Sequence, residues 1–116
     1  MSIPSGSGSE ILTRGFFTVT DTTDTKIIDG AANFIYSVLS ITVCETAGAA
    51  ETFDLFLDPS ASGTDYEILS DQALPANSTF VFNDRLVLQG TDELNFKAGG
   101  ACNIDIIVNY IIQNWT

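Results

Sequence analysis

The chain has 116 residues, enough for one domain with a core of its own. A hydrophobic content of 45% excludes an intrinsically disordered chain. The charged content of 16% lies below the value of about a quarter that is typical of soluble proteins, so we expect partners to cover part of the surface. The net charge is −11, with four basic residues scattered along the sequence. We therefore expect no binding to nucleic acid and none to anionic membranes, because both need clustered Lys and Arg.

The first segment, residues 1–10, is rich in Gly and Ser and predicts an extended N-terminal arm. It has neither the basic start nor the apolar run of a signal peptide, so we expect none. We predict that residues 11–116 form one β-sandwich domain. We also expect the arm to add contact area against a neighbouring subunit.

Short runs of alternating apolar and polar residues, separated by turn residues, predict many β-strands. The stretch 21–33 is rich in turn residues, and no long window shows the apolar period of a helix. The pattern therefore predicts an all-β fold, a single-domain antiparallel β-sandwich that is jelly-roll-like. The expected strands are 11–20, 34–46, 51–58, 66–70, 79–82, 85–88, 93–98 and 102–113.

Side-chain alternation also assigns faces within these strands. We expect Leu39, Ile41 and Val43 to share one face, and Phe56 to point away from the core. The final strand is apolar on both faces.

Ile107 and Ile111 lie on the face of that strand which should be wet in a two-layer sandwich. A covering segment of the chain and a subunit interface both explain this pattern, and Phe56 and Val81 raise the same question.

No catalytic constellation stands out. Histidine is absent, which excludes triads and dyads that use it, and no carboxylate pair has the spacing of a glycosidase. Asp21 and Asp24 could offer oxygens to calcium, but turn capping is the simpler interpretation. Asn77 lies in a glycosylation sequon and is expected to serve the turn after Pro75. We predict that the chain is not an enzyme and holds no cofactor or metal.

The two cysteines, Cys44 and Cys102, are both in predicted strands. Without a CxxC motif or any histidine, a zinc site is close to excluded. A disulfide is possible if the two strands pair. We favour two buried free thiols, because cysteine behaves as a small hydrophobe in cores.

From Phe34 onward, about two-thirds of the chain resembles a group of small β-sandwich proteins encoded in tailed-phage structural gene clusters. The segments that carry the resemblance are Ile35-Tyr36-Ser37-Val38, Ile41-Thr42-Val43-Cys44, Phe53-Asp54-Leu55-Phe56-Leu57, Leu74-Pro75-Ala76-Asn77-Ser78-Thr79, and Leu86-Val87-Leu88 to Asp92-Glu93-Leu94. The resemblance implies a virion protein that is assembled in the host cytoplasm. It also implies a homo-oligomer, with a trimer favoured, at sites where capsid proteins meet.

Our leading hypothesis is a capsid cement or decoration subunit that binds the major capsid protein or other virion proteins. Such a subunit stabilises the shell by binding only its assembled form. An acidic surface would suit a basic patch on the shell. The interface residues that we predict are Ser2, Ile3, Pro4, Ile11, Phe56, Ile107, Ile111 and Trp115.

Two other functions stay open at this point. The first is a tail, neck or fibre-associated subunit of the same class of virion, which copy number per particle would distinguish. The second is a carbohydrate-binding module, since β-sandwiches often bind glycans. That function needs an exposed aromatic platform, for which Tyr36, Tyr66 and Trp115 are the candidates.

Overall fold

A computed structural model describes residues 9–114, which form nine β-strands and one short 3-10 turn at Pro59–Ala61. No helix among these residues is long and apolar enough to cross a membrane. The strands are β1 (Ser9–Val19), β2 (Thr25–Asp29), β3 (Phe34–Glu45), β4 (Glu51–Asp58), β5 (Tyr66–Leu74), β6 (Thr79–Phe82), β7 (Leu86–Gln89), β8 (Glu93–Ala98) and β9 (Ile104–Asn114).

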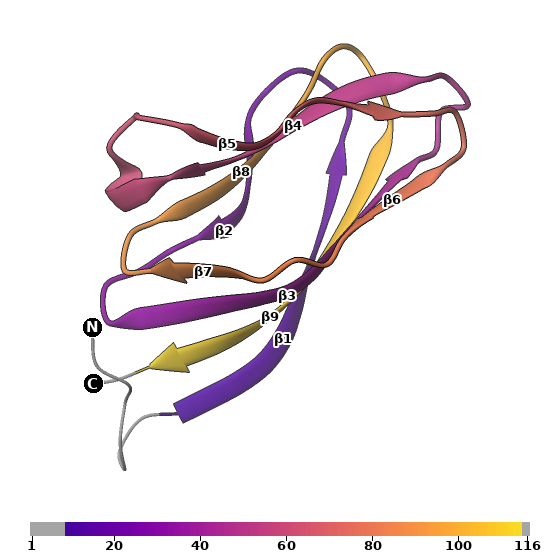
Figure 1. The fold of residues 1–116 in the computed structure, drawn as a ribbon. Coiled ribbons are helices and arrows are strands. Elements are labelled where there is room, and N and C mark those ends of the chain that lie inside the picture. The colour runs from indigo at the N-terminus through magenta and orange to yellow at the C-terminus, as the bar shows by residue number, and fades with distance from the viewer. Residues whose placement is uncertain (1–8, 115–116) are drawn as a thin grey trace.

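The strands form two antiparallel sheets that pack into a β-sandwich, as predicted (Figure 1). The first sheet has the order β1-β9-β3-β6, with β7 also on β3, and the second has the order β2-β8-β4-β5. β6 and β7 pair with different halves of β3, so they occupy one strand position. Counted that way, the chain changes sheet at every connection except β4–β5. This is the connectivity of a jelly roll.

β5 continues to Leu74, beyond the predicted end at residue 70, and two other elements also differ from the prediction. β2 lies inside the stretch that we expected to be turns, where Ile27 and Ile28 are both buried. A register shift between Lys26 and Ile28 lets adjacent residues face the core, which removes the alternation by which strands are recognised. β1 begins at Ser9, so the described end of the predicted arm is already strand, paired with β9.

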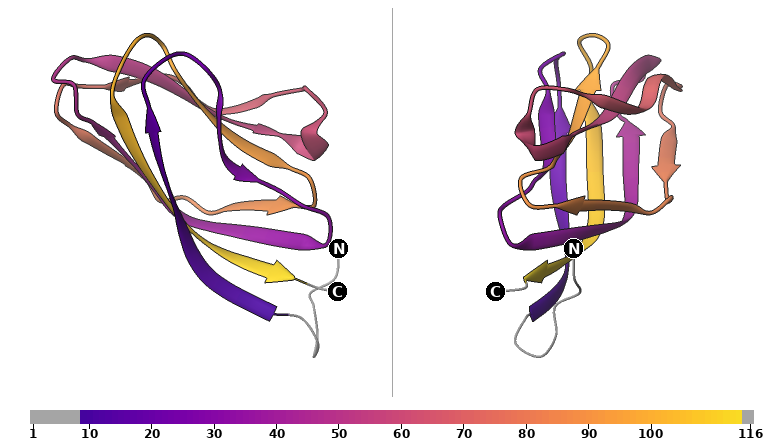
Figure 2. Two further views of the ribbon diagram at one scale, coloured as in Figure 1. Left: turned by 180° about the vertical axis from the view of Figure 1, so that it is seen from behind. Right: turned by 60° about the vertical axis from the view of Figure 1, so that its left-hand side comes forward.

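The three long strands β1, β9 and β3 lie side by side and bend in their middle (Figures 1 and 2). In β3 the bend coincides with a register shift between Val38 and Ser40, where the partner changes from β7 to β6. Leu39 is the extra residue of this bulge and is exposed. The expectation that Leu39 shares the buried face of Ile41 and Val43 is therefore wrong.

The core lies between the sheets and contains a cluster of aromatic rings. Phe53 stacks on Phe96 with ring centroids 5.1 Å apart, and the edge of Phe80 meets Phe53 at 5.6 Å. Phe53 and Phe96 are almost completely buried and come from adjacent strands of the second sheet, while Phe80 comes from the first. The rings therefore join the two layers, which aliphatic side chains complete.

Truncation of Phe53 to alanine should lower the free energy of unfolding by about 3–5 kcal/mol, because it leaves a cavity between the sheets. Urea denaturation followed by circular dichroism measures this loss. Val87→Ala, on an exposed strand position, is the matched control and should change stability by about 0.5 kcal/mol or less. A loss of similar size in both variants would contradict the packing described above.

Candidate functional site

The most deeply buried carboxylate is Glu45, at the end of β3. Its oxygens accept backbone N–H groups from Ala47 at 2.8 Å, Gly48 at 3.0 Å and Asn77 at 2.8 Å. The bond from Asn77 contributes most to holding the pKa of Glu45 below its ordinary value. These bonds join the β3–β4 loop to the β5–β6 turn. Glu45 is a structural anion rather than a catalytic acid.

The other notable acidic groups also stabilise turns. Asp58 accepts the Gly63 N–H at 3.0 Å, and Asp21 accepts the Thr23 N–H at 2.9 Å. Asp21 therefore caps its turn, and residues 9–114 contain no cluster of acidic or cysteine side chains that could hold a metal ion. Asn77 adopts a left-handed conformation with φ of 55°, which places it in the turn after Pro75.

The two cysteines are free thiols, as favoured from the sequence, and each is half-buried rather than fully buried. Cys102 lies just before β9 rather than within a strand, so its predicted position in a strand is wrong, and its thiol donates to the Val19 carbonyl at 3.4 Å. Burial raises the pKa of the Cys102 thiol, since it disfavours the thiolate. The raised pKa makes Cys102 a weak nucleophile at neutral pH.

The two outer faces of the sandwich differ in chemistry. On the second sheet, β4 and β8 place Asp54 opposite Lys97 and Asp58 opposite Glu93. Lys26 Nζ lies 3.0 Å from Glu93 Oε2. Between these two pairs Phe56 lies opposite Asn95, and both are only 5% exposed. Charged side chains on this face therefore surround an apolar position that the chain itself covers.

The first sheet presents two rows of side chains on its outer face. Residues directly opposite one another in antiparallel strands point to the same side, so the strand register gives each row. The first row runs Phe16, Ile107, Thr42 and Val81. The second row runs Leu12, Ile111, Ser37 and Val87. We call the apolar members of the two rows, Leu12, Phe16, Val81, Val87, Ile107 and Ile111, the outer apolar face.

The outer apolar face is open to solvent in the single chain. The exposed fraction is 71% for Leu12, 63% for Phe16, 59% for Val87 and 54% for Val81. Several exposed apolar side chains gathered on one face of a sheet are typical of an interaction site.

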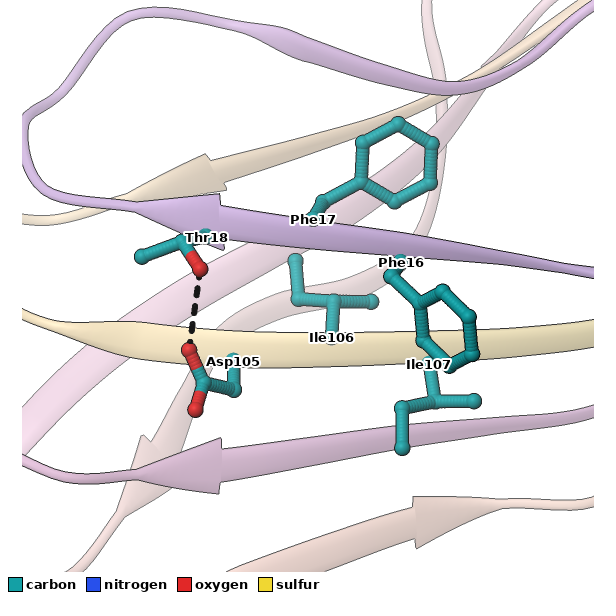
Figure 3. A pocket seen from close by; sticks show the side chains of 6 residues that line it. All are labelled: Phe16, Phe17, Thr18, Asp105, Ile106 and Ile107. Atoms are coloured by element: carbon teal, nitrogen blue, oxygen red, sulfur yellow. Dashed lines mark hydrogen bonds between the residues drawn. The ribbon is translucent and has the colours of Figure 1, made fainter.

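Polar groups lie between and beside the two rows. The Arg14 guanidinium lies 5.3 Å from the centre of the Phe16 ring, and Asn109 donates to the Ser40 hydroxyl at 2.9 Å. Figure 3 shows Phe16 and Ile107 beside a hydrogen bond of 3.0 Å from Thr18 to Asp105. Phe16, Thr18, Asp105 and Ile107, with Phe17 and Ile106, line a shallow depression of about 310 Å³. Its few polar groups are already bonded to one another, so the depression suits a protein surface better than a small polar ligand.

The structure locates the predicted interface residues as follows. Ile107 and Ile111 lie together on the outer apolar face, whereas Ile11 is exposed on the opposite side of the same sheet. Phe56 points away from the core as expected, but it is only 5% exposed, so the expectation that it offers an open contact is wrong. The remaining predicted residues, Ser2, Ile3, Pro4 and Trp115, lie outside the described residues.

Three members of the outer apolar face were missed in the sequence, namely Leu12, Phe16 and Val87, whereas Val81 raised the question of an interface without being among the predicted interface residues. A signal was present for β1, since Leu12 follows Ile11 and Phe16 precedes Phe17, so both faces of that strand are apolar. β6 and β7 have four residues each, too few for alternation to show which side faces water.

The predicted aromatic platform does not form from the described residues. Tyr36 is buried in the core and its hydroxyl accepts the Ala31 N–H at 3.0 Å. Tyr66 is exposed, but it belongs to β5 in the other sheet. Trp115 lies outside the described residues. Tyr36 therefore offers no ring face to a sugar.

No protein-family model and no curated protein sequence matches the chain. Solved structures are similar in fold. One comes from a report that Bacillus endospore appendages form a novel family of disulfide-linked pili, with 14% identity over 99% of this chain and 96% of that chain, and a TM-score of 0.57. Another is the Drosophila NLP core, studied for pentamer formation and histone binding, with 16% identity over 84% and 96% of the two chains and a TM-score of 0.53.

A third similar structure comes from infectious bursal disease virus, Gx strain. It shares 9% identity over 92% of this chain and 37% of that chain, with a TM-score of 0.49. At these identities the comparisons establish the fold alone.

Replacement of Glu45 by Gln should lower the melting temperature at neutral pH, because the amide loses the charge that the three backbone N–H groups stabilise. The pKa of Glu45 is lower in the folded chain than in the unfolded chain, so its stabilising effect is complete above the ordinary Glu pKa of about 4.5. That effect is lost as the pH falls through the lowered pKa of the folded chain.

Melting temperatures measured from pH 7 to about pH 3 test this prediction. The difference between the wild type and Glu45→Gln should shrink at the acid end of the range. Asp84→Asn, at an exposed loop position, is the matched control and should follow the wild type throughout. A constant difference between the wild type and Glu45→Gln would contradict the prediction.

Proposed function

We propose that the chain is a structural subunit of a tailed-phage virion that binds the outside of the capsid as a cement or decoration protein. The observation that carries the proposal is the outer apolar face, which a free monomer would leave in water. The segments between Ile35 and Leu94 resemble tailed-phage structural proteins, and this resemblance supports the assignment to a virion.

The size of the outer apolar face fits the centre of an interface. Its two rows are about 13 Å apart along β1, and the distance across the sheet from β1 through β9 and β3 to β6 and β7 is about 15 Å. The product is a footprint of about 200 Å². Stable interfaces bury about 800 Å² per partner, with an apolar centre and a polar rim. Arg14, Thr18, Asp105 and Asn109 would form part of that rim.

The way in which such a subunit acts follows from mass action. A protein that binds a joint between shell subunits, and not the separated subunits, stabilises the assembled shell by its own binding free energy. The net charge of −11 favours a partner surface with basic side chains. The spore-appendage pili and the NLP pentamer are examples of the use of this fold in assemblies of repeated subunits.

The double variant Phe16→Ser/Val81→Ser should weaken binding to the capsid at least about tenfold, because it removes two exposed apolar side chains from one row. Co-sedimentation with capsids stripped of the protein measures the affinity. Tyr66→Ser removes an exposed aromatic ring from the other sheet and is the matched control. Equal binding by the double variant and the wild type, with both folded, would refute the docking face.

Copy number per particle separates the capsid from the alternative, a tail, neck or fibre-associated subunit. Quantitative mass spectrometry of purified virions should find on the order of hundreds of copies, because a shell repeats its joints many times. A dozen copies or fewer would reject the capsid location in favour of the tail. The trimer that the resemblance implies stays a prediction, and the mass of the protein in solution tests it.

A further inference from the structure

Among the described residues, β1 forms the long free edge of the first sheet. It has 11 residues, and its eleven ladder pairs with β9 run from Ser9–Asn114 to Val19–Ile104 without a register shift. A regular edge of this kind presents a row of N–H and C=O groups that a further strand can pair with.

The other sheet edges carry features that discourage pairing. β2 has only 5 residues and a register shift, while β6 and β7 have four each. β5 is longer, but it has two register shifts against β4, and Asp71 adopts a positive φ of 48°. Natural proteins protect edges with short strands, bulges, proline and lysine. β1 contains neither proline nor lysine and shows no bulge.

The first half of β1 is also exposed on both of its faces. Ile11 and Leu12 point to opposite sides of the sheet, and their exposed fractions are 56% and 71%. In a two-layer sandwich the inward side of a strand is normally covered. A further strand alongside β1 would bury part of both side chains at once.

We propose that β1 pairs with β1 of a second copy of this chain, antiparallel and around a two-fold axis at Leu12. The charges within β1 select the partner and the register. Glu10 and Arg14 are the charged residues of the strand, and both point to the outer face with Leu12. When Leu12 faces Leu12 of the second copy, each Glu10 lies opposite the Arg14 of its neighbour.

Other registers lose this complementarity. Moving the axis to residue 14 places two Arg14 side chains opposite one another. Parallel pairing in register places Glu10 beside Glu10 and Arg14 beside Arg14. Like charges directly opposite in a sheet are destabilising. The strand is therefore self-complementary in one antiparallel register, which identifies a second copy as the occupant of this edge.

The pairing would join the first sheets of two copies into one continuous sheet, β7/β6-β3-β9-β1 followed by the same strands in reverse. The two outer apolar faces would then lie on the same side and form one larger surface. This contact goes beyond the proposed function, because it concerns self-association and holds whether or not the partner is a capsid. It is two-fold, and so it predicts a dimer where the resemblance implies a trimer.

Analytical ultracentrifugation of the full chain, in about 0.15 M salt to screen the general repulsion between two acidic copies, tests the contact. We expect the wild type to dimerise. Glu10→Arg and Arg14→Glu should each raise the dissociation constant at least about tenfold, because each replaces attractive pairs with repulsive ones. The charge-swapped double variant Glu10→Arg/Arg14→Glu should restore the dimer.

Thermal melting of the same variants checks that each is folded. A wild type that stays monomeric, a trimer, or a double variant that fails to recover would overturn the proposal.

A second measurement tests the register directly. In Leu12→Cys the two new thiols face one another across the axis, with Cα atoms about 4.5–5.5 Å apart, within reach of a disulfide. Mild oxidation should give a cross-linked dimer from Leu12→Cys. Val87→Cys, at another exposed position near the opposite edge of the sheet, should give no more cross-linked dimer than the wild type with its native thiols. Equal cross-linking at both positions would overturn the register.

The two proposals can fail separately. Capsid binding by the monomeric Glu10→Arg variant, compared with the wild-type dimer, shows whether self-association is needed for docking, because Glu10 is not part of the proposed docking rim. If the wild type is a monomer and still binds capsids, the β1 contact alone is overturned. Loss of capsid binding with an intact dimer would overturn the proposed function alone.

Discussion

The structure depends on β9, which pairs along its whole length with β1 on one side and β3 on the other. Side chains alternate strictly along such a strand, so the burial of Ile104, Ile106 and Val108 forces Asp105 and Ile107 to the outside. A slip of one residue would exchange the two faces of the sheet. The core therefore fixes the register, and the register then decides which apolar residues are left on the surface.

Charge is distributed around this ladder in a way that keeps the outer apolar face nearly neutral. Several acidic residues serve turns, as Glu45, Asp58 and Asp21 do, or lie on the second sheet beside Lys26 and Lys97. On the outer side of the first sheet, Glu10 and Asp105 are accompanied by Arg14. The large net negative charge makes copies of the chain repel one another despite the exposed patch. The same repulsion opposes self-association, so any contact between copies must be local and specific. Glu10 and Arg14 on β1 are placed to provide such a contact.

The candidate site could be predicted from the sequence only in part, and the rest could not for physical reasons. The doubly apolar pattern of the final strand pointed to Ile107 and Ile111, which do lie together on the outer apolar face. Phe56 showed the same pattern, yet the chain itself covers it. Leu39 was assigned to the core because alternation assumes a regular strand, and a bulge adds one residue. Val81 and Val87 join the site only because β6 and β7 pair with β3.

The sequence by itself determined the all-β class, most strand positions and the lack of histidine chemistry, because these follow from local alternation and composition. Only the tertiary structure decided which sheet each strand joins, since pairing partners such as β1 and β9 are far apart in the chain. It also decided which of two apolar faces is buried, because that depends on what packs against a strand rather than on the strand. The outer apolar face and the free edge of β1 are therefore properties of the fold, although every residue in them was visible in the sequence.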